Sequence, residues 1–537
     1  MSEGVDSTSE GVDPTSEGVD PTSERVDPTS ERVDPTGTHS MERKHIAVIG
    51  GSVIGLGLAL ALSQRGHRVT ILERDATPMP ATHSQAFDEW DRKGSPQVRH
   101  SHALLARLHN LIRDHAPDLL EKLLACGAEE LKFSDRIRQL FDDPEPEEGD
   151  EDVVFLACRR ITFEWVLRRH VIDGGRVEFR DGVVVTGLES RRDEATGLPC
   201  VTGVRVAQGS AEAEVVAADL VVDASGRRSR LRHWLPEIGT PEIREESSPC
   251  GIYYTSRFYR LLDGVEPPAL EGGIVGVDLG YLKVGIFAGD SRVFSITLAA
   301  SPTDDEIRRI LKQPGFEAAV RKIPKAAEWA APDVSQPVSD VHAMSNLNNT
   351  RCWLVEAGEP LVLGFFAVGD AFIHTNPIVG RGCSLGWTAA FNLADSIESH
   401  GGDLRALALE YDATVERDLV PWYKMQLQQD ADAIDVAEAQ QRGEDPYQLL
   451  NADGSNNPKA FMRSLLKEGL VPALRENLTL LRIFMRAMNL LESPGELMRD
   501  PRVMPLLLES YGRRDQREKV YEGPDRLEMV EILSAAS

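Results

Sequence analysis

The stretch that decides the fold is residues 45–75, HIAVIGGSVIGLGLALALSQRGHRVTILERD. Short apolar runs at residues 46–49 and 69–72 predict two buried strands, and the apolar spacing between them predicts a helix. Gly50 and Gly51 directly follow the first strand, and Glu73 follows the second. The order strand, glycine turn, helix, strand and acid is typical of a βαβ unit in a parallel sheet.

Each residue type in this unit suits the binding of an adenine dinucleotide. Gly50 permits a tight exit from the strand, the helix N-terminus offers backbone N–H groups to a pyrophosphate, and Gly55 permits close packing of helix on sheet. Ser52 stands where the usual pattern has its second glycine, and its hydroxyl can donate to a phosphate oxygen. Glu73, followed by Arg74, can accept hydrogen bonds from ribose hydroxyls. The alternative is an ordinary βαβ unit without a ligand.

Length and composition limit the class of protein. A chain of 537 residues is too long for one core, so two or three lobes are expected. The net charge of −27 disfavours nucleic acid and anionic membranes as partners. Six scattered cysteines without a C-x-x-C pair indicate reduced thiols and a cytoplasmic protein. Without a signal peptide or a run of 18 apolar residues, we expect no membrane span.

Two further segments place charge at the start of predicted helices. The run 92–105, RKGSPQVRHSHALL, suits an anionic cofactor, with a solvated basic loop as the alternative. His100 and His102 are half of a possible metal site, but no third ligand has a familiar spacing, so no metal is expected. Arg160 lies where a predicted strand, 153–157, leads into a helix, and can reach a dinucleotide or pair with a nearby acid.

A second glycine-rich turn follows the apolar run 361–368, which predicts a buried strand. That strand ends in Gly369 and Asp370, so a carboxylate lies at the carboxyl end of a strand, where ligands of open α/β sheets bind. Pro377, Gly380 and Gly382 then shape a loop before a long predicted helix. The backbone N–H groups of such a loop can stabilise negative charge on a flavin ring.

The other segments predict different structures. Residues 176–224 read as short strands that end in a third turn, Asp223-Ala224-Ser225-Gly226. Residues 245–360 read as an antiparallel sheet with two short helices, which suits a substrate wall. The apolar run 478–491 is too short to span a membrane. It is either an interfacial membrane helix or, as we expect, a helix packed against the protein.

The three turns together resemble those of the flavoprotein monooxygenases of the para-hydroxybenzoate hydroxylase and squalene epoxidase superfamily, over residues 44–400. The segment 92–102, the helix start Cys158-Arg159-Arg160 and the predicted strand 254–260, YTSRFYR, are similar to a bacterial branch. That branch includes the flavin-dependent polyene epoxidases.

The resemblance implies an α/β fold with a Rossmann-like FAD-binding domain, an antiparallel-sheet substrate domain and a helical C-terminal region. The expected bounds are 41–244 with 361–400 for the discontinuous FAD-binding domain, 245–360 for the substrate domain, and 401–537 for the helical region. Residues 1–40 repeat Ser-Glu-(Gly/Arg)-Val-Asp-Pro-Thr every seven residues, and their prolines exclude a continuous helix. A disordered tail is therefore expected there.

The resemblance also implies cofactor-binding residues. Gly50, Ser52 and Gly55 would cradle the FAD pyrophosphate, and Glu73, with Arg74, would hold the adenosine ribose. Arg160 and Asp370, which follows Gly369, would contact the ribityl and phosphate groups. The remaining contacts would come from the Pro377, Gly380 and Gly382 loop at the isoalloxazine edge and from Gln97, Arg99 and His102 on the flavin side of the pocket.

The implied reaction is reduction of FAD by NAD(P)H, capture of O2 as a flavin C4a-hydroperoxide, and transfer of one oxygen atom to an apolar or aromatic small molecule. Because the cofactor supplies the reactive group, the residues need no general base. His374 is the candidate catalytic residue, with packing at a strand end as its alternative role. Self-reducing hydroxylases usually carry Asp-Gly where this chain has Ser225-Gly226, so a partner flavin reductase is an alternative electron source.

Three other functions remain open at this point. The same fold can serve an FAD-dependent reductase that acts on C=C bonds, as in the geranylgeranyl reductases. Flavin-dependent halogenases share the Asp-x-Ser-Gly turn, but this chain lacks their Trp-x-Trp-x-Ile-Pro segment. A non-catalytic flavin-binding scaffold would use the repeats and the helical C-terminus for partners.

Overall fold

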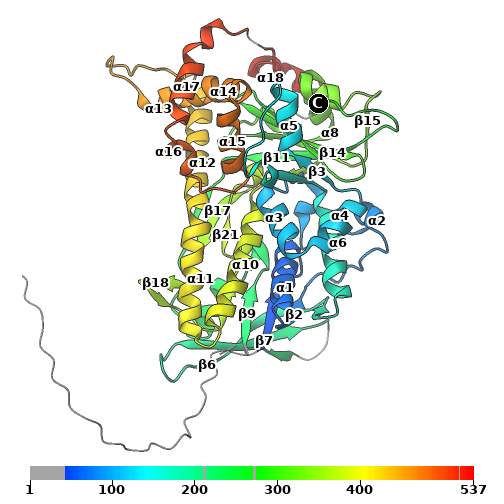
Figure 1. The fold of residues 1–537 in the computed structure, drawn as a ribbon, viewed down its shortest axis with the longest axis vertical. Coiled ribbons are helices and arrows are strands. Elements are labelled where there is room, and N and C mark those ends of the chain that lie inside the picture. Colours follow the sequence, from blue (N-terminus) through cyan, green and yellow to red (C-terminus); the bar gives the residue numbers. More distant parts are fainter. Residues whose placement is uncertain (1–42, 210–212, 270–273, 519, 537) are drawn as a thin grey trace, which may run out of the picture. The chain divides into compact units, whose positions relative to one another are not determined.

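In the computed structural model, which describes residues 43–209, 213–269, 274–518 and 520–536, the predicted βαβ unit lies within a five-stranded parallel sheet (Figure 1). The repeat tail expected at residues 1–40 lies outside the described residues. The strand order is β20-β9-β1-β2-β5. The strands are β1 (His45–Ile49), β2 (Arg68–Leu72), β5 (Val177–Arg180), β9 (Leu220–Asp223) and β20 (Phe365–Ala367).

Helix α1 (Val53–Gln64) crosses from β1 to β2 and is buried along most of its circumference. One side packs on the sheet, and Gly57 lies against the Trp387 ring of α10 (Gly382–His400). A side chain at Gly57 would overlap that ring, because its Cβ would lie 2.6 Å from Trp387 Cε2. A helix that is apolar all round is stable only in such a buried layer.

The expected strand 361–368 is shorter in the structure. Only Phe365–Ala367 pair with β9, as β20. Gly364 adopts a φ of +70°, and a Cβ there would come within 2.8 Å of the Val201 carbonyl oxygen. The backbone therefore turns at Gly364 before the strand begins.

A second, antiparallel sheet contains the strands expected in residues 245–360. Its order is β12-β13-β14-β11-β15, with β16 also paired to β11. The strands are β11 (Tyr253–Leu261), β12 (Ile274–Asp278), β13 (Leu282–Ala288), β14 (Val293–Ala300), β15 (Ser335–Pro337) and β16 (His342–Met344).

The two faces of this sheet differ because successive strand residues alternate between faces. In β14, Phe294 and Ile296 join an apolar core with α8 (Gln313–Lys322), α9 (Pro324–Trp329) and α18 (Arg526–Ala535). Ser295 and Thr297 face the opposite way and hydrogen bond to Ser101. The polar face therefore meets the segment that was predicted to line the flavin.

Helices make up most of the chain after β21 (Ile373–His374). α11 (Leu404–Asp418) and α12 (Val420–Gln441) follow one another along one side of the structure (Figure 1). The later helices are α13 (Pro458–Leu465), α14 (Val471–Glu476), α15 (Leu478–Met488), α16 (Glu496–Arg499), α17 (Val503–Gly512) and α18. No helix within the described residues is long and apolar enough to cross a membrane.

The apolar run 478–491 forms α15, which packs against the protein. Leu481 and Met485 are buried against α5 (Phe133–Leu140), and Arg482 holds the Asp150 carboxylate at 2.9 Å. Asp150 is only 7% exposed, and its pairing with Arg482, 332 residues later, accounts for the burial of its charge.

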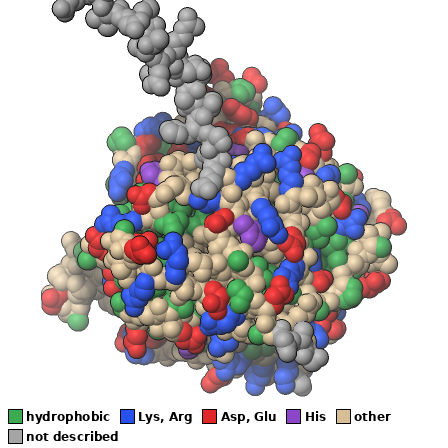
Figure 2. Space-filling model, turned by 90° about the horizontal axis from the view of Figure 1, so that it is seen from below, with side chains coloured by type: hydrophobic (Ala, Val, Ile, Leu, Met, Phe, Trp, Pro, Cys, Tyr) green, Lys and Arg blue, Asp and Glu red, His purple; other side chains and the backbone are tan. Residues whose placement is uncertain are grey.

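The remaining helices and strands are α2 (His83–Glu89), α3 (Ala106–His115), α4 (Pro117–Ala125), β3 (Glu129–Lys132), β4 (Val154–Ala157), α6 (Arg160–Asp173), β6 (Val184–Arg192), β7 (Pro199–Ala207), β8 (Glu214–Ala217), α7 (Leu231–Glu237), β10 (Glu245–Pro249), β17 (Asn348–Cys352), β18 (Val355–Glu356) and β19 (Glu359–Pro360). Their strands form smaller sheets, β10-β17-β21, β18-β19, β3-β4 and β6-β7-β8. Figure 2 shows acidic and basic side chains interspersed on one face.

Candidate functional site

The glycine turn after β1 leaves no room for side chains. Gly50 has a φ of +105°, and a Cβ there would lie 2.7 Å from the Ala224 carbonyl oxygen. A Cβ at Gly51 would overlap the Phe179 ring at 2.6 Å, and one at Gly55 would lie 1.9 Å from the Gly50 carbonyl oxygen. The turn is therefore a cradle of bare backbone at the N-terminus of α1, which suits a phosphate group.

Glu73 ends β2 beside this cradle. Its carboxylate accepts hydrogen bonds from the backbone N–H groups of Gly51 and Asp75, each at 2.8 Å. The side chain thus ties the end of the second strand to the turn after the first. Arg74 is exposed, and its side chain pairs with no other residue in the part of the chain that the structure describes.

Ser52 lies within a buried network of charges. Its hydroxyl donates to Glu164 Oε2 at 2.7 Å and accepts from Arg160 Nη2 at 3.1 Å and from the Ser95 hydroxyl at 3.0 Å. Arg160 also donates to Glu164 through Nη1 at 2.8 Å. The predicted Ser52 and Arg160, 108 residues apart, are therefore direct neighbours.

Two members of this network were not predicted. Glu164 is fully buried, and Arg92, 2% exposed, donates to it at 2.8 Å and to Asp75 at 2.8 Å. Burial alone would raise the pKa of Glu164, but Arg92 and Arg160 hold this pKa below its ordinary value. The spacing of Arg160 and Glu164, one helical turn apart, is the signal that could have identified the acid.

The network retains a buried donor that suits an anionic ligand. Arg160 Nε has no hydrogen-bond partner among the described residues. A buried guanidinium donor beside a bare glycine turn matches the oxygen-rich pyrophosphate of a dinucleotide. The residues present therefore fit FAD on geometry and charge.

His102 and His100 lie on the segment that crosses the polar face of the antiparallel sheet. His102 Nδ1 is 3.0 Å from the His100 carbonyl oxygen, and His100 Nδ1 is 3.2 Å from the Ser256 hydroxyl. Burial, with Arg160 next in effect, lowers the pKa of His102 to about 4, and burial lowers that of His100 to about 3. Both rings are therefore neutral at pH 7.

Gln97 and Arg99 lie in a short 3-10 helix, Pro96–Arg99, and both are partly buried. The Arg99 guanidinium lies 5.5 Å from the Phe87 ring centroid and donates to the Phe87 carbonyl oxygen. Gln97 makes no side-chain hydrogen bond within the described part of the chain. In this structure Arg99 is thus engaged with α2.

The late glycine turn meets the early one directly. A Cβ at Gly369 would lie 3.2 Å from Ile54 Cγ2, and one at Gly386 would lie 2.4 Å from Ile54 Cδ1. Ile54 stands at the start of α1, beside the cradle. The turn after β20 and the start of α10 therefore border the same site as the turn after β1.

His374 and Asp370 flank this late turn. His374 is 5% exposed, and its Nδ1 lies 2.5 Å from the Asn348 carbonyl oxygen, so Nδ1 carries the proton. Its Nε2 then lies 4.0 Å from Asp370 Oδ2. Through Nδ1 the His374 ring is bonded to the neighbouring strand, while its Nε2 is on the side of Asp370.

The predicted flavin-facing loop, Pro377 to Gly382, directly follows Asn376 and leads into α10. Pro377–Val379 form one 3-10 turn, and Gly380 has a φ of +70° with Ala103 in close contact. Gly382 is the first residue of α10, and a Cβ there would have no atom within 4 Å among its described neighbours. Arg381, buried, donates to Gln426 of α12 at 3.1 Å.

Asp430 of α12 fastens this loop. Its carboxylate accepts from Asn376 at 2.9 Å, from Asn349 at 2.7 Å and from Gln426 at 2.8 Å. Burial raises the pKa of Asp430, while the three amide donors act in the opposite direction. A residue of the helical C-terminal region, Asp430, thus holds Asn376, which directly precedes the loop. No sequence motif around Asp430 predicts this contact.

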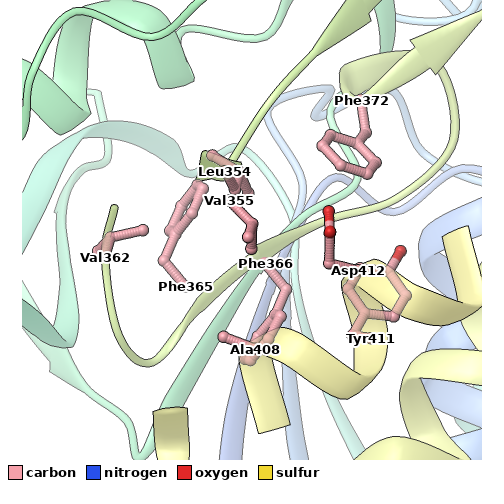
Figure 3. Close-up of a pocket in the computed structure, with 9 residues that line it drawn as sticks. All are labelled: Leu354, Val355, Val362, Phe365, Phe366, Phe372, Ala408, Tyr411 and Asp412. Atoms are coloured by element: carbon pink, nitrogen blue, oxygen red, sulfur yellow. The ribbon is translucent and has the colours of Figure 1, made fainter. Parts of the chain in front are cut away.

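Next to the loop lies a cavity of about 520 Å³. It is bounded by residues 376–379, by α12 and by the ends of β13 and β14. Its volume lies within the range of small-molecule pockets. A second cavity, of about 20 Å³ between Phe365, Phe372 and Tyr411, has room for about one water molecule (Figure 3).

No group of three or more His, Cys, Asp or Glu side chains is arranged to hold a metal ion within residues 43–209, 213–269, 274–518 and 520–536. All six cysteines are free thiols. The Asp223 carboxylate of the middle turn is fully buried and accepts from the hydroxyls of Ser225 at 2.6 Å and Ser229 at 2.5 Å. The middle turn is thus bonded within itself.

Comparisons with known proteins agree with this geometry. Residues 8–93 match a model of the pyridine nucleotide-disulphide oxidoreductase family. Protein Rv3254 of Mycobacterium tuberculosis is 26% identical over 413 residues, which cover 71% of this chain and 79% of that protein.

Solved structures with a similar fold include three flavoenzymes. The flavin-dependent halogenase CmlS is 19% identical over 71% of this chain, with a TM-score of 0.51, and 63% of its length is covered. A triple mutant of the flavin-dependent brominase Bmp2 is 16% identical over 75% of this chain and 92% of its own, with a TM-score of 0.52. The anhydrotetracycline hydroxylase OxyS of Streptomyces rimosus is 19% identical over 83% of this chain and 76% of its own, with a TM-score of 0.51.

At these identities the structures establish the fold. The predicted fold class is confirmed: an α/β fold with a Rossmann-type FAD-binding domain, antiparallel sheets and a helical C-terminal region. The chain therefore has the fold that these FAD-dependent oxidoreductases share.

Proposed function

We propose that this protein is an FAD-dependent monooxygenase that transfers one oxygen atom from O2 to a small molecule, by hydroxylation or epoxidation. The observation that carries the proposal is the contact of Ile54 with Gly369 and Gly386, which brings both glycine turns to one site. The 520 Å³ cavity beside residues 376–379 supports it, because a substrate there would lie against the loop assigned to the flavin.

The proposed cofactor site joins both turns. The bare backbone at Gly50 and Gly55, with the Ser52 hydroxyl, would bind the pyrophosphate. Glu73 and Arg74 would hold the adenosine ribose. The rest of FAD would lie against Gln97, Arg99, His102, Arg160, Gly369, Asp370, Pro377, Gly380 and Gly382. When bound, FAD supplies the redox chemistry with O2, and the chain supplies orientation and electrostatics.

The residues of the chain have three tasks in this proposal. Arg160 and Ser52 place positive charge and hydroxyl donors at the phosphates. The loop 376–382 and the N-terminus of α10 offer backbone donors to negative charge on the ring. His374, with Nδ1 fixed on the Asn348 carbonyl, holds Nε2 ready to accept or share a proton near Asp370.

The electron source is part of the proposal. NAD(P)H would reduce the flavin directly or through a separate flavin reductase. The internal hydrogen bonds of Ser225 and Ser229 to Asp223 leave the middle turn little capacity for a further ligand, which favours the reductase. The segments 92–102 and 254–260, similar to the polyene epoxidase branch, favour epoxidation of a C=C bond.

Substrate-dependent NADPH oxidation by the FAD-loaded protein, with and without a general flavin reductase, tests the electron source. Labelled O2 in the same reaction tests the chemistry. One labelled oxygen atom in the product is the expected result. A reduced product without labelled oxygen would instead identify a C=C reductase, and a protein that takes up no FAD would contradict the cofactor assignment.

A further inference from the structure

The cavity between α12 and the antiparallel sheet has a lining with a distinct pattern. On α12 its lining includes Gln429, Ala433, Ala437 and Gln440. These positions are three or four residues apart, so they form one stripe along the helix. The stripe has an amide group at each end and methyl groups between them.

Other small or apolar side chains of the lining come from outside α12. They are Ala299 and Ala300 at the end of β14, and Ile378 and Val379 of the flavin-facing loop. Small side chains in the lining leave space that a larger residue would fill. An extended, apolar ligand body suits this slot.

The charged side chains that line the cavity already have partners. Arg526 of α18 holds Asp304 at 2.8 Å and Glu306 at 2.8 Å. Lys283 pairs with Asp278, and Asp430 is occupied by its three amide donors. A charged ligand would therefore lose hydration without gaining a free counter-charge.

The amides at the two ends of the stripe remain available. The Gln429 and Gln440 side chains make no hydrogen bond among the described residues, and both are exposed. An amide can donate to a carbonyl or hydroxyl oxygen and accept from a hydroxyl. The stripe thus has a hydrogen-bonding amide at each end, and the charged side chains of the lining already have partners.

We propose that this cavity binds an elongated, uncharged molecule with an apolar body and hydroxyl or carbonyl oxygens towards both ends. The proposal names the substrate class of the monooxygenase proposed above and rests on that function for calling the ligand a substrate. The binding preference itself is a property of the cavity and can be measured without turnover.

Three rigid probes that share one skeleton separate the possibilities: androstanediol, with oxygen at both ends, androstanol, with oxygen at one end, and androstanediol disulfate, with charge at both ends. Equilibrium dialysis against the FAD-loaded full chain gives the Kd of each. We expect the diol to bind about tenfold more tightly than the other two. Androstanol would leave one glutamine amide without its hydrogen-bond partner, and the disulfate would lose the hydration of its charges. Equal binding of all three, or preference for the disulfate, would overturn the proposal.

Matched variants locate the site. Ala433→Phe fills the middle of the slot and is expected to weaken diol binding at least about tenfold. Ala431→Phe, on an exposed position of the same helix outside the lining, is expected to leave the Kd unchanged. Gln429→Met keeps the size of the side chain and is expected to reduce the preference of diol over androstanol. Diol binding that Ala433→Phe does not change would place the ligand elsewhere and contradict the proposal.

Flavin absorbance and labelled-oxygen incorporation are measured on the same samples. If diol selectivity fails while FAD stays bound and oxygen is incorporated into a substrate, only the substrate class is wrong. If selectivity and its loss in Ala433→Phe hold while no oxygen is incorporated, the monooxygenase proposal is wrong and the cavity preference stands.

Discussion

Asn376 donates a hydrogen bond to Asp430 at 2.9 Å across 54 residues of sequence. Asn376 directly precedes the loop assigned to the flavin edge, and Asp430 lies on α12, which lines the cavity. The same carboxylate therefore borders the proposed substrate site and fixes the loop beside the proposed cofactor site.

Asp430→Ala is expected to destabilise the protein by about 1–3 kcal/mol, because it leaves buried amide donors unpaired. It is also expected to weaken FAD binding, since the loop 376–382 loses its anchor. Urea unfolding and FAD titration measure the two effects. The control is Asp435→Ala. Asp435 is an exposed acid that also lies on α12 and pairs with Lys459 of α13, so its removal is expected to cost under about 1 kcal/mol. Equal effects of both variants would contradict the anchoring role.

Gly55→Ala is expected to abolish FAD binding and to lower stability strongly. Its Cβ would lie 1.9 Å from the Gly50 carbonyl oxygen, so the turn itself must shift. Gly402→Ala adds the same methyl group at an exposed position with nothing within 4 Å and serves as control. FAD titration by flavin fluorescence and thermal unfolding check both variants. Normal FAD affinity in Gly55→Ala would show that the turn does not cradle the cofactor.

Arg92→Met is expected to cost about 3–5 kcal/mol of stability. The buried guanidinium neutralises Glu164 and Asp75, and its removal leaves uncompensated buried charge. Arg68→Met removes an exposed arginine 3.6 Å from Glu178, for which about 0–1 kcal/mol is expected. Denaturant unfolding compares the two variants, and a cost below about 1 kcal/mol for Arg92→Met would disprove the buried-charge argument.

His100 predicts a specific pH dependence of stability. Burial lowers its pKa to about 3, whereas the unfolded chain titrates near about 6.5. Above that value both states are neutral; below it only the unfolded state binds the proton. The contribution of His100 therefore falls by as much as about 1.4 kcal/mol per pH unit from pH 6.5 towards pH 3.

His100→Gln removes this titration. The difference in unfolding free energy between the natural protein and the variant is expected to shrink as the pH falls from 7 to 5. A constant difference for His100→Gln would mean that the ring is not held neutral by burial.

Local patterns sufficed for much of the fold. The alternation of apolar runs and glycine turns around residues 45–75 predicts β1, α1 and β2, because a strand in a parallel sheet is apolar throughout and its crossover helix must be buried. The antiparallel strands followed from short β-branched and aromatic runs. The strand at 361–368 was overestimated, because the turn at Gly364 depends on its contact with Val201.

The site was less accessible from sequence because its key contacts span long separations. Arg92 and Glu164 are 72 residues apart, and nothing local marks Asp430 as the partner of Asn349, 81 residues earlier. The cavity lies between α12 and the ends of β13 and β14. The residue pattern of α12 predicts a helix, but it does not predict which strands this helix lies beside. The binding roles of the residues assigned to FAD remain predictions.

The position of α18 has a practical consequence. Met529 and Leu533 complete the apolar core under the antiparallel sheet, and Arg526 completes the ion pairs at the cavity rim. Truncation of the chain before Arg526 would therefore expose the apolar core under the antiparallel sheet. It would also leave Asp304 and Glu306, at the cavity, without their ion-pair partner. Protection of α18, Arg526–Ala535, from proteolysis would therefore report whether the cavity is filled.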